Sequence, residues 1–518
     1  MNRKRQLLSA KLLSQRRAGT LLSYGYIVIN CLVVLVYQPI MLRIMGKSEY
    51  GLYQLMAQFI NYMSVMDMGF GNGIVVFTAR YRATGRADSE KKLHGMFRII
   101  FSGIGAVAVA LGLFLTWKTQ WIFGASLTSD ELYKGRILML ILTLNMGVTF
   151  PLCIYENIII AYENFVYTKL IAILRAIINP LIMLPLLFLG GDSIAMVSVL
   201  VGVNITCLVS NCLYCRKKLG VKVSYHGFDK RVFKEIFSYS IFVFLAEIVD
   251  KVNWSVDTTI LGIVRGTGEV AVYSMAANYN QLVQQLSAAF SSVTLPRITA
   301  MASVGASDRQ LSDEFIKVSR LQICCIFLAA SGFCMFGRKF VMWHAGVGYA
   351  TSYAVACILI LSSAVPLTQS VALAIIKAKD KFRFRAVLVC CMAAVNVVVS
   401  IPLAKLFGSV GSACGTALSL VLANTLVLNI YYKRRCGIDI PRYWRTLLSM
   451  SVRFLIPMVP VLALKYLLPV NGIFELAVYG PVYVILYCLV SYYLVMNEYE
   501  KSVVHSVAHK LHLIKGKK

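Results

Sequence analysis

The sequence predicts an all-α polytopic membrane protein, because of its composition, the spacing of its apolar segments and the placement of its charges. Of the 518 residues, 58% are hydrophobic and only 14% are charged. This is more apolar surface than soluble domains of ordinary composition can bury. Most of the chain is therefore expected to face lipid.

The apolar segments have the length of membrane-spanning helices. A hydrocarbon core about 30 Å thick needs about 20 apolar residues per helix. The chain contains about 14 such segments, which leave almost no sequence for an independent soluble domain. The predicted transmembrane helices are residues 20–42, 53–78, 98–117, 137–160, 169–189, 194–214, 236–262, 270–296, 318–336, 350–376, 385–404, 410–432, 447–468 and 473–496.

The positive charge is distributed unevenly over the loops. The formal net charge is +29, and 39 of the 52 Lys and Arg residues lie in the tails, in loops that follow even-numbered spans or at the span ends beside those loops. Only 10 lie in loops that follow odd-numbered spans or at the span ends beside them. Cytoplasmic loops carry such an excess, so both termini are predicted to be cytoplasmic. The bias explains the net charge without a nucleic-acid partner. We call the two sets the even loops and the odd loops.

An internal repeat organises the spans into two lobes. GKSEYGLYQLMA (46–57) aligns without gaps on GTGEVAVYSMAA (266–277), and both segments follow the first helix of a series of six. Six is an even number, so the halves have the same orientation and are expected to be related by an axis along the membrane normal. The coincident pairs are Gly46/Gly266, Glu49/Glu269, Tyr53/Tyr273 and Ala57/Ala277.

The repeat, together with the two tails, predicts the domain organisation. Both tails mix basic and apolar residues, as helices on a membrane surface do. The predicted parts are a basic cytoplasmic interfacial segment (1–19), an N-lobe (20–214), a cytoplasmic inter-lobe loop (215–235), a C-lobe (236–432), two extra C-terminal helices (447–496) and a cytoplasmic amphipathic tail (497–518).

Two parallel six-helix lobes around a central cavity are typical of a transporter, because rocking one lobe against the other opens the cavity to either side. Signatures of enzymes are lacking. MGKS (45–48) resembles the end of a phosphate-binding loop, but Met41 stands where that loop needs its first Gly. The sequence contains no GxSxG and no HExxH. We predict no enzymatic activity, no catalytic residue, no metal site and no cofactor.

Four features together resemble the polysaccharide transporter family of the multidrug/oligosaccharidyl-lipid/polysaccharide exporter superfamily. They are the fourteen spans, GKSEYGLYQ in the first odd loop, VMDMGFGNG (65–73) and WSVDTTILGIVRGTGEVAVYSMAANY (254–279). The resemblance implies a flippase of the O-antigen type in the bacterial plasma (inner) membrane. Its substrate would be an undecaprenyl-pyrophosphate-linked oligosaccharide, the repeat unit of O-antigen, capsule or exopolysaccharide, moved from the inner to the outer leaflet by alternating access.

The resemblance also implies partners for the chain. Besides the lipid-linked oligosaccharide and membrane lipids, these are a polysaccharide polymerase and chain-length proteins. The two extra helices are expected to form a groove for the lipid tail. Two alternatives stay open at this point: a cation- or proton-coupled exporter of small amphiphiles with the same fold, and a membrane glycan polymerase or ligase.

A pyrophosphate needs cations reachable from the cytoplasmic leaflet, and Arg offers it two donors in a fixed geometry. The alternative is that cations near helix ends reach the lipid headgroups and fix the topology. Arg175 lies about six residues into the fifth span and is the leading candidate. The candidate cavity cations are Arg80, Arg175, Arg297, Lys377 and Arg453.

Two acids in the N-lobe are also candidates. Asp67 lies in the second span beside Gly69 and Gly73, a spacing that permits close helix packing or a bend. We expect Asp67 to serve either lobe packing or the cavity. Glu156 lies deep in the fourth span, where an ionisable residue suggests a functional site.

The seventh span contains the densest group of charges. At 100° per residue, Glu247, Asp250, Lys251 and Asp257 fall within an arc of about 120°. This stripe is predicted to line the central cavity, because a charge facing lipid costs about 2.5–3.5 kcal/mol. Glu247 and Lys251 are four residues apart and can pair. Asp250 and Asp257 are hypothesised to bind a coupling Na+ or H+, or to pair with Arg175 or another residue of the lobes.

Overall fold

The computed structural model confirms the all-α class. The part of the chain that it describes contains helices and turns but no β-strand. Within that part, ten helices are long and apolar enough to cross a membrane, and the helix order is compatible with fourteen spans. The described residues are 15, 18–19, 22–23, 25–67, 70–225, 232–234, 236–238, 255–379, 381–468, 470, 472 and 474–510.

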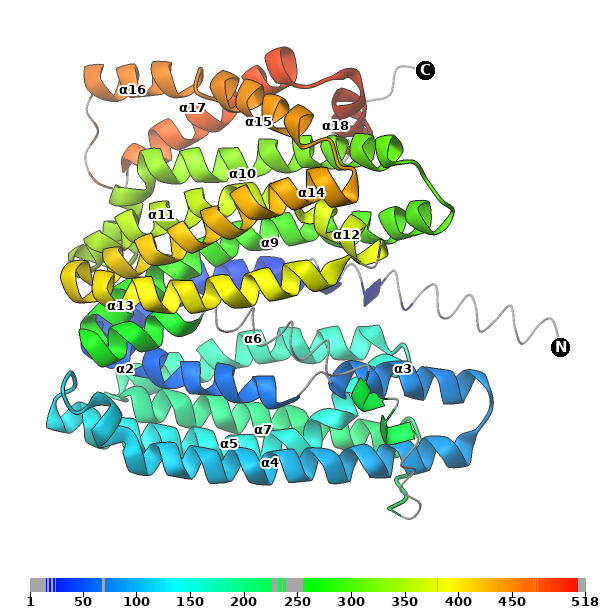
Figure 1. The fold of residues 1–518 in the computed structure, drawn as a ribbon. Coiled ribbons are helices and arrows are strands. Elements are labelled where there is room, and N and C mark those ends of the chain that lie inside the picture. Colours follow the sequence, from blue (N-terminus) through cyan, green and yellow to red (C-terminus); the bar gives the residue numbers. More distant parts are fainter. Residues whose placement is uncertain are drawn as a thin grey trace. The chain divides into compact units, whose positions relative to one another are not determined.

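The chain divides into two compact units, which Figure 1 shows as ribbons. The first comprises Met1–Ser274 with Ala404–Ser409, and the second comprises Met275–Leu403 with Val410–Lys518. The division falls inside the helix α9 (Thr267–Ser303). The lobe boundaries expected from the repeat stay a prediction.

The first unit is a helical bundle whose core is rich in aromatic rings. In Figure 1, α4 and α5 run side by side, and α5 also packs against α7. Phe70, Phe97 and Phe101 lie in its buried apolar cluster. The helices are η1 (Val33–Tyr37), α2 (Gln38–Ser64), η2 (Val65–Asp67), α3 (Phe70–Ala83), α4 (Ala87–Phe123), α5 (Ser129–Ala161), α6 (Phe165–Phe188), α7 (Ser193–Lys217) and the short helix Ser255–Val264.

The first odd loop is a single-glycine turn. Gly46 interrupts α2 with φ 78° and ψ 175°, and the residues on both sides are helical. The predicted spans 20–42 and 53–78 leave residues 43–52 as a loop. The observed turn is much shorter, because the polar residues on both sides of Gly46 continue the helices. Gly266, the partner of Gly46 in the repeat, has φ 85°. Positive φ is accessible to Gly at little cost, so the repeat places glycine where both turns need it.

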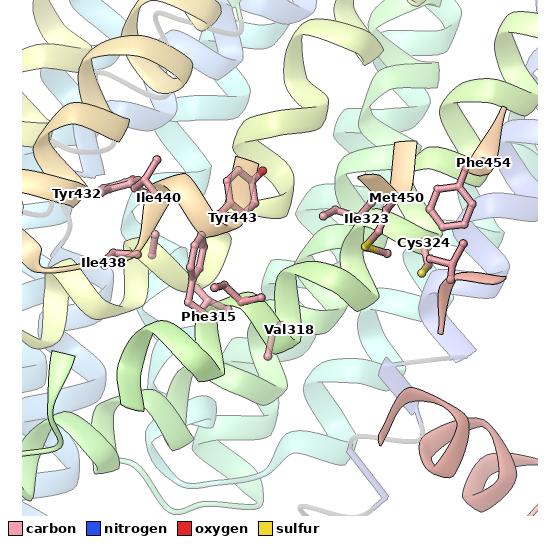
Figure 2. Close-up of a cluster of buried hydrophobic side chains, with 14 of the residues drawn as sticks. Phe315, Val318, Ile323, Cys324, Tyr432, Ile438, Ile440, Tyr443, Met450 and Phe454 are labelled. Carbon is pink, nitrogen blue, oxygen red and sulfur yellow. The ribbon is translucent and has the colours of Figure 1, made fainter. Parts of the chain in front are cut away.

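The second unit packs its two last spans against α10 (Asp308–His344). Figure 2 shows the rings of Phe315 and Tyr443 facing each other, with centroids 5.3 Å apart. Phe454 stacks on Tyr487 at 4.7 Å. The other helices are η3 (Val347–Tyr349), α11 (Ala350–Thr368), α12 (Ser370–Ala378), α13 (Phe382–Leu420), η4 (Val421–Val427), α14 (Leu428–Cys436), α15 (Ile440–Phe454), α16 (Met458–Leu467), α17 (Phe474–Val490), η5 (Ser491–Val495) and α18 (Glu498–Lys510).

The C-terminal helix α18 is fixed to α10 by a buried ion pair. Arg320 Nε donates to Glu500 Oε1 at 2.5 Å, and Arg320 Nη2 donates to Oε2 at 3.0 Å. Glu500 has no exposed surface. The backbone N–H of Glu500 donates to Asn497 Oδ1 at 2.9 Å, and the backbone N–H of Asn497 donates to Glu500 Oε2 at 2.9 Å. One carboxylate thus caps the start of α18 and holds the helix on the bundle.

We expect Glu500→Gln to release α18. Removing one charge of a buried pair costs about 3–5 kcal/mol, since the other charge stays buried. The purified variant should show a lower melting temperature and faster proteolysis of the C-terminal segment. Glu498→Gln, at an exposed position of the same first turn, is the control. Equal proteolysis of the two variants would contradict the role of the pair.

Candidate functional site

The turn between spans one and two packs directly on the turn between spans seven and eight, within the first unit. Ser48 Oγ lies 3.3 Å from Thr267 Oγ1. A Cβ added at Gly51 would lie 1.9 Å from the carbonyl oxygen of Thr267, and one at Gly262 would lie 2.5 Å from Leu55 Cδ1. Only glycine permits backbones to approach this closely. The two segments related by the repeat therefore close on each other at the odd-loop end.

Glu131, near the start of α5, joins both turns. Its Oε1 accepts hydrogen bonds from Ser48 Oγ and, at 2.6 Å, from Thr267 Oγ1. Beside it, Ser126 Oγ donates to the carbonyl oxygen of Gly262 at 2.6 Å. Hydrogen bonds to a charged acceptor are stronger than neutral ones. We name this group of contacts the odd-end clasp; its residues are Ser48, Gly51, Ser126, Glu131, Gly262 and Thr267.

Two glutamates related by the repeat hold further helix starts beside the clasp. Glu49 Oε2 accepts from the backbone N–H of Ser193, the first residue of α7, at 3.2 Å, and its Oε1 accepts from Lys134 Nζ at 2.5 Å. Gly408 interrupts α13 with φ 60° and ψ −137°. Glu269 Oε2 accepts from the backbone N–H of the next residue, Ser409, at 2.7 Å. Such N–H groups lack partners inside their own helix and favour a negative charge. The same side chain therefore has the same task in both halves of the repeat.

Arg175 lies on a polar face of α6. The side chain is half-buried, and its Nε and the Oδ1 of Asn179 are buried atoms without a hydrogen-bond partner among the described residues. One turn further along, Met183 Sδ accepts from Tyr37 Oη at 3.1 Å, so this face of α6 lies along the π-helical segment η1. π-Helical segments are frequent at functional sites. A guanidinium with a free N–H can donate a hydrogen bond to a phosphate oxygen.

Two other predicted cations belong to the even-loop ends of spans two and ten. Arg80 is exposed near the end of α3, with its guanidinium carbon 4.8 Å from the centroid of the Phe77 ring. Lys377 lies in α12, but its side chain is outside the described part of the structure. A role for either in substrate binding stays a prediction.

The remaining two predicted cations, both in the second unit, have protein partners. Arg297 Nη1 lies 3.2 Å from Glu314 Oε1, and its side chain is 58% exposed. Arg453 Nη1 donates to the carbonyl oxygen of Leu494 at 2.9 Å, so it connects the two last spans. Both side chains are solvent- or lipid-accessible, and their binding role likewise stays a prediction.

Asp67 is the last residue of η2, the short 3-10 helix that follows α2 in the second span. A Cβ added at Gly71 would lie 3.1 Å from both Asp67 Oδ2 and Asn157 Nδ2, so Gly71 leaves room for two polar side chains. Glu156, the neighbour of Asn157 in α5, is exposed. These groups form a second polar region of the first unit.

The charged stripe of the seventh span is described only at its end. Glu247, Asp250 and Lys251 lie outside the described residues. Asp257 is completely buried in the first unit, and its Oδ2 accepts from Tyr273 Oη at 2.8 Å. Tyr273 belongs to the repeat segment that begins at Gly266, so this buried acid is connected to the turn that forms the clasp.

Sequence reasoning missed the clasp. Glu49 and Glu269 stood out only as coincident repeat positions. Ser48, Ser126 and Thr267 gave no signal, because hydroxyl side chains are common in membrane helices, where they often bond to backbone carbonyls.

Repeat-related helices with closely packed turns at one end are typical of membrane transporters. The sequence matches the family model described as polysaccharide biosynthesis protein over residues 17–302, more than half of its length, and the chain therefore belongs to this family. This confirms the resemblance stated from the sequence. No curated protein matches the chain.

Solved structures of transporters share the fold. The structure is similar to lipid II flippase MurJ in an inward closed conformation, with a TM-score of 0.70 and 15% identity over 91% of this chain and 97% of that chain. It is also similar to an inward-facing multidrug resistance MATE transporter of the MOP superfamily, with a TM-score of 0.63 and 10% identity over 81% of this chain and 99% of that chain. A mutant of the Vibrio cholerae MATE transporter VcmN is similar with a TM-score of 0.54 and 13% identity over 84% of this chain and 100% of that chain. The family and the fold are those of transporters and flippases.

We expect Gly51→Ala to loosen the odd-end clasp. The new Cβ would overlap the Thr267 carbonyl oxygen, and backbone must move to relieve the overlap. Hydrogen–deuterium exchange should accelerate in residues 262–268 of the purified variant, because local opening exposes amides. Gly103→Ala is the control, since nothing lies within 4 Å of a Cβ there. Unchanged exchange in Gly51→Ala would mean that the turns do not depend on this contact.

Proposed function

We propose that the chain is a flippase that moves an undecaprenyl-pyrophosphate-linked oligosaccharide from the inner to the outer leaflet by alternating access. The cargo is the repeat unit of an O-antigen, a capsule or an exopolysaccharide. The observation that carries this proposal is the hydrogen-bonded odd-end clasp in a chain of the polysaccharide biosynthesis protein family. Each such bond contributes a net stabilisation of about 0.5–3 kcal/mol. A few such hydrogen bonds can hold one end of the protein closed and still break within a transport cycle.

The charge distribution supports the direction of transport. Because the even loops and tails carry 39 of the 52 basic residues, we assign them to the cytoplasm of a bacterium and the clasp to the outer side of the plasma membrane. With the clasp closed, substrate would enter from the inner leaflet. Polysaccharide polymerase and chain-length proteins would then act on the product, and we propose them as partners.

Arg175 is the proposed contact for the pyrophosphate. The lipid tail would lie against the apolar surfaces that the two last spans expose. These contacts follow from chemistry: the anion needs hydrogen-bond donors, and the tail needs a surface without charge.

Reconstitution tests the function. Purified protein in liposomes would receive a polyprenyl-pyrophosphate-linked oligosaccharide on the even-loop face, with no polymerase present. We expect the glycan to become accessible to an impermeant glycosidase on the odd-loop face. Extension of the glycan would favour the polymerase or ligase alternative. Absence of movement by folded protein would contradict a flippase, and movement in the opposite direction alone would contradict the assigned orientation.

Arg175→Gln should reduce transport in this assay by about 10- to 150-fold at limiting substrate. The variant loses a charge-assisted interaction worth about 1.5–3 kcal/mol. Arg175→Lys should retain more activity, since it keeps the charge. Lys169→Gln in the same helix is the control for loss of a positive charge. Equal activity of Arg175→Gln and Lys169→Gln would indicate that Arg175 only contacts headgroups.

A coupled exporter of small amphiphiles is the second candidate, and Asp257 favours it. A carboxylate buried in a membrane helix and bonded to Tyr273 suits the binding of Na+ or a proton, and the fold is also that of multidrug transporters. We propose ion coupling through Asp257 for either cargo. Efflux of a cationic dye, with no movement of the lipid-linked glycan, would support the exporter.

Under this proposal, Asp257→Asn should abolish the dependence of transport on a Na+ or proton gradient. The neutral amide cannot bind and release a proton, and it has no negative charge to attract Na+. Transport rates would be measured with and without each gradient. The exposed Asp88→Asn in α4 is the control and should keep the dependence. Gradient dependence that survives in Asp257→Asn would exclude this residue as the coupling site.

A further inference from the structure

The second unit contains an apolar groove between α10 and α17. Its volume is about 320 Å³, near the lower end of the range of about 300–1,000 Å³ for ligand pockets. A Cβ added at Gly332 would meet only Tyr483 Cε1, at 3.8 Å, so the groove has room there. It is lined by Leu328, Ala329, Gly332, Phe333, Phe336, Gly337, Phe340, Leu476, Gly480, Tyr483 and Val484.

A cluster with excess positive charge lies at the odd-loop end of the same helices. Both oxygens of Glu475 are paired, Oε2 with Lys339 Nζ and Oε1 with Lys465 Nζ at 2.5 Å. The Glu475 side chain is only 6% exposed, whereas that of Lys339 is 44% exposed. Two ammonium groups share one carboxylate, so the cluster has a net charge of about +1, with the positive charge at the accessible side.

The cluster and the groove are adjacent. Lys465 Nζ lies 5.0 Å from the centroid of the Phe336 ring, which lines the groove. Leu476 lines the groove next to Glu475 in the chain, and Phe340 does so next to Lys339. A molecule with an apolar chain in the groove would thus place its polar end beside two lysines. This arrangement matches an amphiphile with an anionic head.

We propose that the groove and the lysine pair form a binding site for an anionic phospholipid with a single phosphodiester. One acyl chain occupies the groove, and the phosphate accepts a hydrogen bond from Lys339, the more exposed of the two lysines. Lys465, which also donates to the carbonyl oxygen of Met335 at 3.2 Å, contributes its charge. Basic pockets between membrane helices bind anionic headgroups in this way. A zwitterionic lipid carries an ammonium group that opposes the cluster's excess charge. The proposal concerns this unit alone and does not depend on which cargo the chain moves.

Lipid binding to the delipidated, detergent-purified full chain tests the proposal. Native mass spectrometry would count bound phosphatidylglycerol and phosphatidylcholine at equal concentrations. We expect one tight phosphatidylglycerol site, preferred over phosphatidylcholine by about fivefold or more per lysine. Equal binding of the two lipids would overturn the proposal, as would displacement of phosphatidylglycerol by an equimolar polyprenyl pyrophosphate, which would assign the groove to that lipid.

Two variants test the contacts to the lipid headgroup and to the acyl chain separately. Lys339→Gln should remove most of the preference for phosphatidylglycerol and keep the binding of phosphatidylcholine, whereas Gly332→Leu, which fills the groove, should weaken the binding of both lipids. Lys433→Gln and Val478→Leu, at exposed positions outside the site, are the matched controls. Variants that are folded by size-exclusion chromatography but bind both lipids like the wild type would refute the site.

Discussion

Pairing of carboxylates with hydrogen-bond donors at the odd-loop end is the interaction on which the first unit depends. Helix starts present N–H groups without intrahelical partners. Glu49 and Glu269 accept from two such N–H groups, and Glu131 accepts from the hydroxyl groups of two turns. The glycines allow the backbones to approach, and the glutamates supply the acceptors that this approach requires. Closure is therefore built from bonds that water can replace.

Under the proposed function, this chemistry would allow the odd-loop end to close and open. An apolar seal would have to expose its area to water on opening, at about 25 cal/mol for each Å². Hydroxyl–carboxylate bonds are exchanged for bonds to water at a smaller net cost. Asp257 bonds to Tyr273, in the helix that begins at the clasp. A change of charge on that acid would reach the clasp through the first turns of this helix, which is a short physical route for coupling.

The sequence predicted the fold class and the family, and the repeat paired Gly46 with Gly266, because periodicity, composition and a repeat can be read without knowing which residues touch. It did not predict the roles of Glu49 and Glu269, since their partners Ser193 and Ser409 are 144 and 140 residues away. Only the packed bundle brings those groups together. Arg175 could be selected by its depth in a span, whereas its relation to the π-helical segment η1 depends on packing between helices and has no sequence signal.

The central claim is that the odd-end clasp must open for transport. The most direct test is transport by Ser48→Cys/Thr267→Cys in liposomes, because the native hydroxyl oxygens lie 3.3 Å apart. A disulfide there should stop the movement of lipid-linked glycan, and reduction should restore it, while Ser48→Cys alone should transport under both conditions. Unimpaired transport with the disulfide formed would show that the clasp stays closed during the cycle and would contradict the account.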